Sequence, residues 1–183
     1  MSSILNSVTA KPMATIRSPG RRRLVLGLLA APFAAHAIAD PTAGLTRWGT
    51  GNFRRFGFLV YEATLWSGGE DPQRPPLALR LTYKRNIAGK AIAEASVKEM
   101  RQLGVADEKQ LALWGEQMAR IFPDVQPEDQ IVGLHLPQGA RFFHNGRLIG
   151  AIGDPGFAEG FFAIWLDPKT SAPDLRAALL RRS

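Results

Sequence analysis

The chain has 183 residues, of which 23 are Lys or Arg and 16 are Asp or Glu, giving a formal net charge of +7. Five of the basic residues and none of the acidic ones lie in the first 39 positions, so residues 40–183 carry 18 basic against 16 acidic residues, or +2. This small charge argues against a nucleic-acid partner. Cysteine is absent, which excludes disulfides, thiolate metal sites and a cysteine nucleophile.

Residues 1–39 have the composition of an export signal. A basic start is followed by the apolar run LVLGLLAAPFAAHAIA, which at 16 residues is shorter than the ~20 that a membrane-spanning helix needs. The run ends in small residues, so we expect a signal peptide that is cleaved after Ala39 or Ala37. The Sec route and the twin-arginine route, to which Arg21-Arg22 points, both stay open, and an uncleaved N-terminal anchor is the alternative. We therefore expect one exported, periplasmic domain, residues 40–183, with no stable membrane span.

Two strands are predicted first in this domain. The stretch FRRFGFLVYEATLW (53–66) is rich in aromatic and β-branched residues, which predicts one strand with Phe56, Phe58 and Val60 on a single face. In LALRLTYK (77–84) the larger apolar residues alternate with other side chains, typical of a strand with one buried face. The link SGGEDPQRPP consists of turn-forming residues and is predicted to be a surface loop.

Two helices are predicted next. Residues 88–103 carry a moderate apolar stripe that ends at Gly104. A second helix is predicted from Asp107, which with Gln110 can cap the first turn, to the residue before Pro123. Its apolar residues recur at helical spacing.

The remaining pattern predicts a second group of strands followed by two more helices. Residues 130–136 read as a strand, and a hairpin is predicted around Asn145-Gly146, a pair that suits a type I′ turn. Asp154 caps the next predicted helix and Pro155 opens it, and a last helix is predicted from Ser171. The order of these elements predicts an α+β domain in which an antiparallel sheet is backed by a helical layer.

The aromatic residues between positions 140 and 166 either fill a core or line a pocket. Phe157, Phe161, Ile164 and Trp165 form one stripe at helical spacing, and such a stripe is more often core than pocket. Phe162 lies beside this stripe. The adjacent Phe142 and Phe143 must point to opposite faces of a strand. If both sheet faces are apolar there, helices cover one of them, and a second layer or a ligand covers the other.

Few residues form a recognisable chemical motif. Residues 40–183 hold two histidines, His135 and His144, without the spacing of a zinc site, and no Gly-x-Ser-x-Gly motif is present. The glycine-rich GTGNFRR is not followed by a helix N-terminus, so it fails as a phosphate-binding loop. The stretch ends in Arg54 and Arg55, whose side chains are expected to point to opposite faces of the strand. An inward-facing arginine needs an anionic partner; the alternative is that both arginines lie in solvent.

Several segments resemble the bacterial chalcone isomerase-like family over nearly the whole of residues 40–183. The matching pieces are GTGNFRRFGFLVYEATLW, LALRLTYKRNIAGKAIAEAS, IFPDVQPEDQI and FFHNGRLIGAIGDPGFAEGFFAIWLDPKTSAPDLRAALL. The most telling are Asn145-Gly146, Phe157-Ala158 with Phe161-Phe162, and Ile164-Trp165-Leu166. The resemblance implies a chalcone isomerase-like fold, an open-faced β-sandwich with an antiparallel sheet, a helical layer and a ligand cleft between the two layers.

The resemblance implies an activity less clearly than a fold. The plant enzymes of this family use an arginine after a glycine-rich turn, a threonine, a tyrosine and an asparagine. Here the arginine matches Arg54, the threonine position falls on Phe56, and the other two fall near Gly89 and Ala95. Catalysis is therefore not expected. Relatives with this non-catalytic pattern include fatty-acid-binding proteins, in which an arginine and a tyrosine hold the carboxylate, and some relatives have been associated with haem.

We therefore expect a non-catalytic binder of an apolar, acidic small molecule such as a fatty acid, with no metal and no cofactor. The expected ligand-binding residues are Arg54, Tyr61 and Tyr83 for the carboxylate and Phe142, Phe161 and Phe162 for the tail. Arg55 takes the place of Arg54 if the strand is out of phase by one residue. The alternatives are an isomerase or lyase acting on a lipid or phenolic substrate, and a b-type haem protein with His144 as the iron ligand. The oligomeric state stays open.

Overall fold

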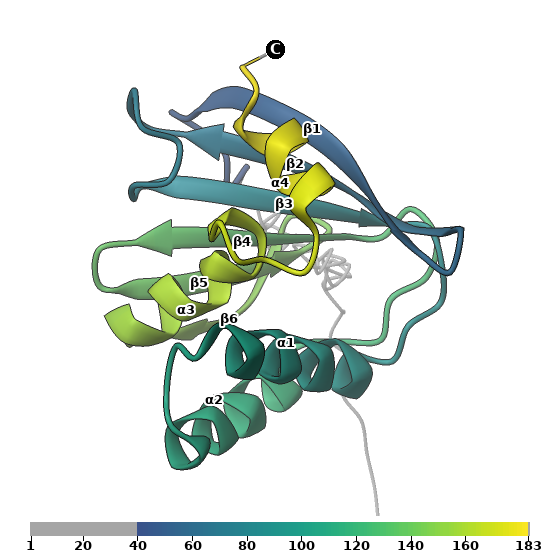
Figure 1. Ribbon diagram of the computed structural model, residues 1–183, viewed down its shortest axis with the longest axis vertical. Coiled ribbons are helices and arrows are strands. Elements are labelled where there is room, and N and C mark those ends of the chain that lie inside the picture. Colours follow the sequence, from purple (N-terminus) through teal and green to yellow (C-terminus); the bar gives the residue numbers. More distant parts are fainter. Residues whose placement is uncertain (1–39, 183) are drawn as a thin grey trace, which may run out of the picture. The chain divides into compact units, whose positions relative to one another are not determined.

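The computed structural model describes residues 40–182, which form a six-stranded antiparallel sheet and four helices (Figure 1). The strands are β1 (Thr46–Arg55), β2 (Phe58–Ser67), β3 (Leu77–Tyr83), β4 (Gln130–Leu136), β5 (Gly139–His144) and β6 (Arg147–Ile152). The helices are α1 (Gly89–Leu103), α2 (Glu108–Ile121), α3 (Pro155–Leu166) and α4 (Pro173–Leu180). The predicted α+β fold with an antiparallel sheet is confirmed. The predicted signal peptide lies outside the described residues.

The sheet is a simple meander in which each strand pairs with the next along the chain, from β1 to β6. α3 packs on β4 and β5, and α4 packs on β1 and β2. α1 and α2 contact each other, while α1 also contacts α3 and α2 contacts β6, so this pair extends the helical layer (Figure 1). Within residues 40–182 no helix combines the length and the apolar character that crossing a membrane requires.

The structure corrects the first predicted strand, because residues 53–66 contain a hairpin turn. β1 ends at Arg55 and β2 begins at Phe58. The two residues between them have positive φ angles, 50° at Phe56 and 81° at Gly57, as a tight two-residue hairpin requires. Phe-Gly is not one of the usual pairs for such a turn, so the pattern hides it. Phe56 and Phe58 consequently lie at an exposed tip instead of on a common face with Val60.

The two predicted helix caps and the predicted Asn145-Gly146 turn are present at the expected positions. The Asp107 side chain accepts a hydrogen bond from the Gln110 backbone N–H at 2.8 Å and caps α2. Asp154 caps α3 in the same way, accepting from the Phe157 N–H at 3.2 Å. Asn145-Gly146 forms the β5–β6 turn with φ angles of 49° and 79°. Each signal acts within four residues, which is why the sequence alone is sufficient to find it.

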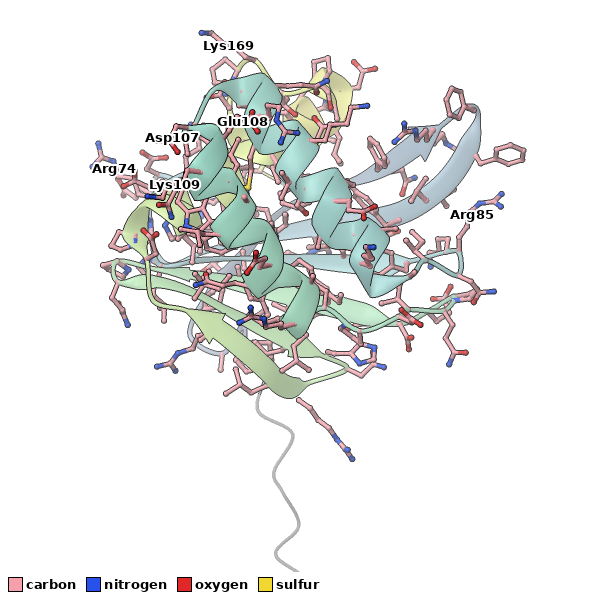
Figure 2. The ribbon with its side chains drawn as sticks, turned by 90° about the horizontal axis from the view of Figure 1, so that it is seen from below. Arg74, Arg85, Asp107, Glu108, Lys109 and Lys169 are labelled. Atoms are coloured by element: carbon pink, nitrogen blue, oxygen red, sulfur yellow. The ribbon has the colours of Figure 1, made fainter. Side chains whose placement is uncertain are left out.

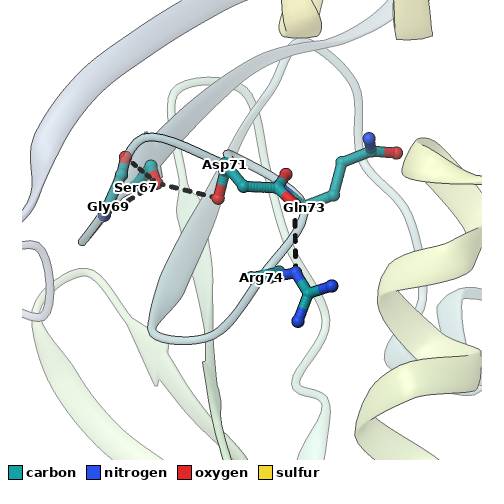
Figure 3. Close-up of polar contacts among 5 residues, drawn as sticks. All are labelled: Ser67, Gly69, Asp71, Gln73 and Arg74. Carbon is teal, nitrogen blue, oxygen red and sulfur yellow. Dashed lines mark hydrogen bonds and ion pairs between the residues drawn. The ribbon is translucent and has the colours of Figure 1, made fainter.

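The predicted surface loop between β2 and β3 is ordered by its own side chains (Figure 3). The Ser67 hydroxyl accepts from the Gly69 N–H at 3.1 Å and donates to the Gly69 carbonyl at 2.9 Å. The Asp71 carboxylate accepts from the Gln73 N–H at 2.9 Å and pairs with the Arg74 guanidinium at 3.2 Å. These short-range bonds hold an exposed segment in one shape.

The glycine-rich stretch GTGNF belongs to β1, where it lies under α4. A Cβ atom added to Gly49 would overlap the backbone carbonyl oxygen of Leu179, and Gly51 lies under the same helix. The Trp48 indole N–H donates to the Leu180 carbonyl at 3.0 Å. Glycine is needed here because a helix backbone and a strand backbone approach each other closely.

The main core lies between the sheet and the helices, and α3 is its centre. Eight of the twelve residues of α3 are buried, so the buried surface is wider than the predicted stripe and includes Phe162. A helix that is apolar on all sides is one surrounded by protein, and α3 contacts β4, β5, α1 and α4. Phe142 belongs to this core, whereas Phe143 belongs to a small second cluster with Ala78 and Val132. The prediction that the two phenylalanines point to opposite faces is confirmed.

Candidate ligand-binding pocket

A pocket of about 330 Å³ lies between the sheet and the helices, a size typical of small-molecule sites. One side is formed by residues of β1 to β4 and the other by α1, α3 and the segment just before α4. The lining is mainly apolar, and Leu81, Ile92, Phe122, Ile131, Phe161 and Ile164 are representative of it. Its polar side chains are Arg55, Tyr61, Tyr83, Ser96, Glu99 and Ser171. The pocket therefore suits an apolar molecule with a polar end.

Tyr61 is held in place at the pocket by one residue of α3 and one residue of the neighbouring strand β1. Its hydroxyl accepts a hydrogen bond from the Trp165 indole N–H at 3.0 Å, and its ring stacks on Phe53 at 4.9 Å. Burial raises the pKa of the phenol far above its ordinary value, the hydrogen bond from Trp165 opposes this, and the negative charge of Glu99 adds to it. Tyr61 is therefore a neutral phenol at physiological pH.

Tyr83 presents a hydroxyl to the pocket. The residue is 3% exposed, and its ring meets that of Tyr61 edge to face at 6.0 Å. Its hydroxyl makes no hydrogen bond with any residue between 40 and 182. Burial, followed by the neighbouring Tyr61, raises its pKa far above the ordinary value. The hydroxyl is not completely enclosed by protein, so an acceptor on a ligand in the pocket can bond to it.

The structure places Arg55, and not Arg54, at the pocket. Phe53 pairs with Tyr61 across the β1–β2 ladder, the ladder shifts its register between Phe53 and Arg54, and Phe53 and Tyr61 both line the pocket. Arg55 lines the pocket. The Arg54 side chain instead donates to the Gly57 carbonyl at 3.3 Å, within the hairpin turn. Arg55 forms no ion pair with residues 40–182, so its charge is available to a ligand.

Glu99 and Ser171 supply the acidic part of the lining. The Ser171 hydroxyl donates to the Glu99 carboxylate at 2.6 Å, which ties α1 to the segment before α4. A carboxylate at this position repels a ligand carboxylate that approaches it. A ligand with an acidic end is therefore directed toward Arg55 and away from Glu99.

The structure separates the predicted ligand-binding residues into two groups. Tyr61, Tyr83 and Phe161 line the pocket. Phe142 does not: it is fully buried in the core, where its ring meets those of Phe122 and Phe161 edge to face at 5.0 Å and 5.2 Å. Its place on β5 is under α3, beyond the reach of the pocket.

Phe162 lies on the side of α3 that faces away from this pocket. Its ring stacks on that of His135 at 4.9 Å, and both residues line a second, open hollow of about 420 Å³ beside the β2–β3 loop. His135 is 6% exposed and its Nδ1 has no hydrogen-bond partner among the described residues. Burial lowers the pKa of this imidazole, which Glu159 partly opposes, so the ring is neutral at physiological pH.

The remaining predicted positions are also outside the pocket, with one exception. His144 lies at the end of β5 with its Nε2 3.5 Å from the Asp129 carboxylate, and it lines neither hollow. Phe56, at the threonine position of the plant enzymes, is on the exposed tip. Gly89 packs the start of α1 against the Phe122 carbonyl. Only Ala95 lines the pocket, and it contributes a methyl group.

Most of the pocket lining was not predicted from the sequence, and its unpredicted polar contacts include those of Trp165, Glu99 and Ser171. A weak signal exists for Trp165, because a buried indole N–H needs an acceptor. Nothing local connects Glu99 with Ser171, which are separated by 72 positions.

Comparisons with known proteins agree with this architecture. Residues 45–181 match the family described as chalcone isomerase-like. An uncharacterized protein of Haemophilus influenzae is 31% identical over 128 residues, which are 69% of this chain and 63% of that protein, so the chain spans less than two thirds of its relative. The crystal structure of a fatty-acid binding protein of Arabidopsis thaliana superposes with a TM-score of 0.57 at 11% identity, over 75% of this chain and 87% of the other. At that identity the likeness shows a shared fold.

Proposed function

We propose that this chain, which belongs to the chalcone isomerase-like family, binds a fatty acid or a similar apolar acid in the pocket between its sheet and helices. One observation carries the proposal: an apolar pocket is lined by the cation Arg55, which forms no ion pair with residues 40–182, and by Tyr83, whose hydroxyl has no hydrogen-bond partner among those residues. The shared fold of the Arabidopsis thaliana fatty-acid binding protein supports it.

The lining accounts for both ends of such a ligand. Arg55 supplies the positive charge for a carboxylate, and the neutral phenols Tyr83 and Tyr61 supply O–H donors. The acyl chain lies against apolar residues such as Ile92 and Phe161, where each buried methylene contributes about 0.8 kcal/mol. The Glu99 carboxylate sets the orientation by repelling the acidic end.

Arg55→Ala should weaken the binding of dodecanoate by about tenfold or more, measured by isothermal titration calorimetry. A hydrogen bond to a charged group contributes about 1.5–3 kcal/mol, and about 1.4 kcal/mol is tenfold in affinity. Arg54→Ala is the matched control, since it removes the same charge one residue away but outside the pocket. Thermal stability should change little in either variant, because both side chains are exposed.

Tyr83→Phe tests the second part of the carboxylate site without altering the packing of the ring. We expect weaker dodecanoate binding together with an unchanged or higher melting temperature, because the variant removes an unpartnered hydroxyl. Equal dodecanoate affinity in the wild type, Arg55→Ala and Tyr83→Phe would refute the carboxylate site. Mass spectrometry of the organic extract of the purified protein then identifies what the pocket carries.

We also propose that residues 1–39 direct export to the periplasm. The support is the charge asymmetry of the chain and the small residues that end the apolar run. N-terminal sequencing of the protein from a periplasmic fraction should begin at Asp40 or at Ile38. A cytoplasmic protein that begins at Met1 or Met13 would contradict this proposal.

A further inference from the structure

The tip of the β1–β2 hairpin exposes two phenylalanine side chains. Phe56 is 87% exposed and Phe58 is 59% exposed, and they are the exposed aromatic residues of the described part of the chain. Figure 2 shows the hairpin extending beyond the helical layer, with Arg85 on the same side. A single exposed apolar residue needs no explanation, but two aromatic residues at one projecting tip indicate a contact with another apolar phase.

The backbone of the turn does not account for Phe56. The β5–β6 turn has nearly the same geometry, with φ angles of 49° and 79° against 50° and 81° at Phe56-Gly57. That turn uses Asn145-Gly146, the pair that positive φ favours, and a bulky aromatic residue is uncommon in this conformation. Phe56 neither favours the turn conformation nor packs in the core. We therefore look for its role in a contact between the hairpin tip and another molecule.

Three arginines surround these rings. The Arg85 guanidinium lies 4.5 Å from the centre of the Phe58 ring, and that of Arg55 lies 5.5 Å from the centre of the Phe56 ring. With Arg54, which is bonded to the turn, they place three cations at the tip, and none forms an ion pair with residues 40–182.

Acidic groups near the tip do not cancel this charge. Lys84, next to Arg85, pairs with Glu128 at 2.8 Å, so these two neutralise each other. Within the hairpin the first carboxylate beyond the tip is Glu62, which pairs with Asn52 further along the ladder. The tip therefore combines exposed aromatic rings with a local positive charge.

We propose that this tip docks the protein on an anionic membrane surface. Phe56 and Phe58 enter the interfacial region, where aromatic side chains are favoured, while the arginines contact anionic headgroups, each contributing to attraction near the surface. The tip is convex and projects from the protein. Such a shape can insert into a deformable membrane surface more easily than a groove on the protein could. Arg55 also lines the pocket, so docking brings the pocket close to lipid. The docking itself goes beyond the proposed function and does not require an occupied pocket.

Co-sedimentation with vesicles tests the proposal on the full chain. The probes are vesicles of phosphatidylcholine with phosphatidylglycerol and vesicles of phosphatidylcholine alone. Phe56→Asn combined with Phe58→Thr should reduce binding to the anionic vesicles at least tenfold, since two aromatic side chains no longer insert. The melting temperature should not fall, because asparagine suits the turn and threonine suits a strand. Arg85→Ala should reduce the binding about fivefold, and added salt should do the same for the wild type.

The double variant Arg147→Ala with Leu148→Ala is the matched control. It removes an exposed cation and an exposed apolar side chain from β6, away from the β1–β2 tip, and should leave vesicle binding unchanged. Every variant retains residues 1–39, so differences among them report on the tip. Equal vesicle binding by the tip variants and the wild type would overturn the proposal, as would self-association in sedimentation velocity that the tip variants abolish. Dodecanoate affinity should be unchanged in Arg85→Ala, because Arg85 does not line the pocket, and this separates the proposal from that for the pocket.

Discussion

Replacing Phe142 by alanine should lower the free energy of unfolding by about 3–5 kcal/mol, the cost typical of removing a buried phenylalanine. The side chain is fully buried and packs edge to face against Phe122, Phe157 and Phe161, so its loss leaves a cavity lined by rings that are already held by other contacts. Equilibrium denaturation in urea measures the loss as a shift of the midpoint.

The control for this prediction is Leu148→Ala, which removes a side chain that is 60% exposed and should change the free energy of unfolding by no more than about 0.5 kcal/mol. The prediction also distinguishes the core from the pocket. If Phe142→Ala weakened dodecanoate binding while stability stayed unchanged, Phe142 would be a ligand contact and not a core residue.

Gly49→Ala should destabilise the protein by about 3 kcal/mol, at the upper end of the cost of overpacking. The added methyl would overlap the Leu179 carbonyl oxygen and would lie 2.6 Å from that of Ala178. Both are backbone atoms of α4, so the helix must move away from β1. Because Ala172, just before α4, lines the pocket, dodecanoate binding should weaken as well.

Gly69→Ala is the matched control for this substitution. A methyl group at Gly69 meets nothing within 4 Å, so the free energy of unfolding should stay within about 0.5 kcal/mol of the wild type. Denaturation in urea compares the two variants directly. Equal stability of Gly49→Ala and Gly69→Ala would show that α4 does not require the close approach to β1.

Much of the fold can be read from the sequence because its signals are local. The Asp107 and Asp154 caps each act within three residues, and the Asn145-Gly146 turn is determined by the conformations of two. Strand alternation and helical spacing then determine which side chains are buried together. The α+β architecture and its antiparallel sheet follow from the order of these elements, and the resemblance to the chalcone isomerase-like family agrees with it.

The β1–β2 turn shows where local signals fail. Phe56-Gly57 has the backbone of a tight hairpin turn but not its usual residues, so residues 53–66 look like one continuous strand. The same error leaves the faces of the two neighbouring arginines undecided from sequence. Only the tertiary structure shows that Arg55 lines the pocket together with Phe53 and Tyr61.

The composition of the pocket is decided by tertiary structure alone. Tyr61 and Trp165 are 104 positions apart and share a hydrogen bond, and Glu99 and Ser171 are 72 positions apart and share another. Phe142 and Phe161 are equally apolar in sequence, yet the first is enclosed in the core and the second also lines the pocket. Sequence periodicity shows that a side chain is turned inward, but how the helices pack across the sheet decides whether it meets other side chains or a space that a ligand can fill.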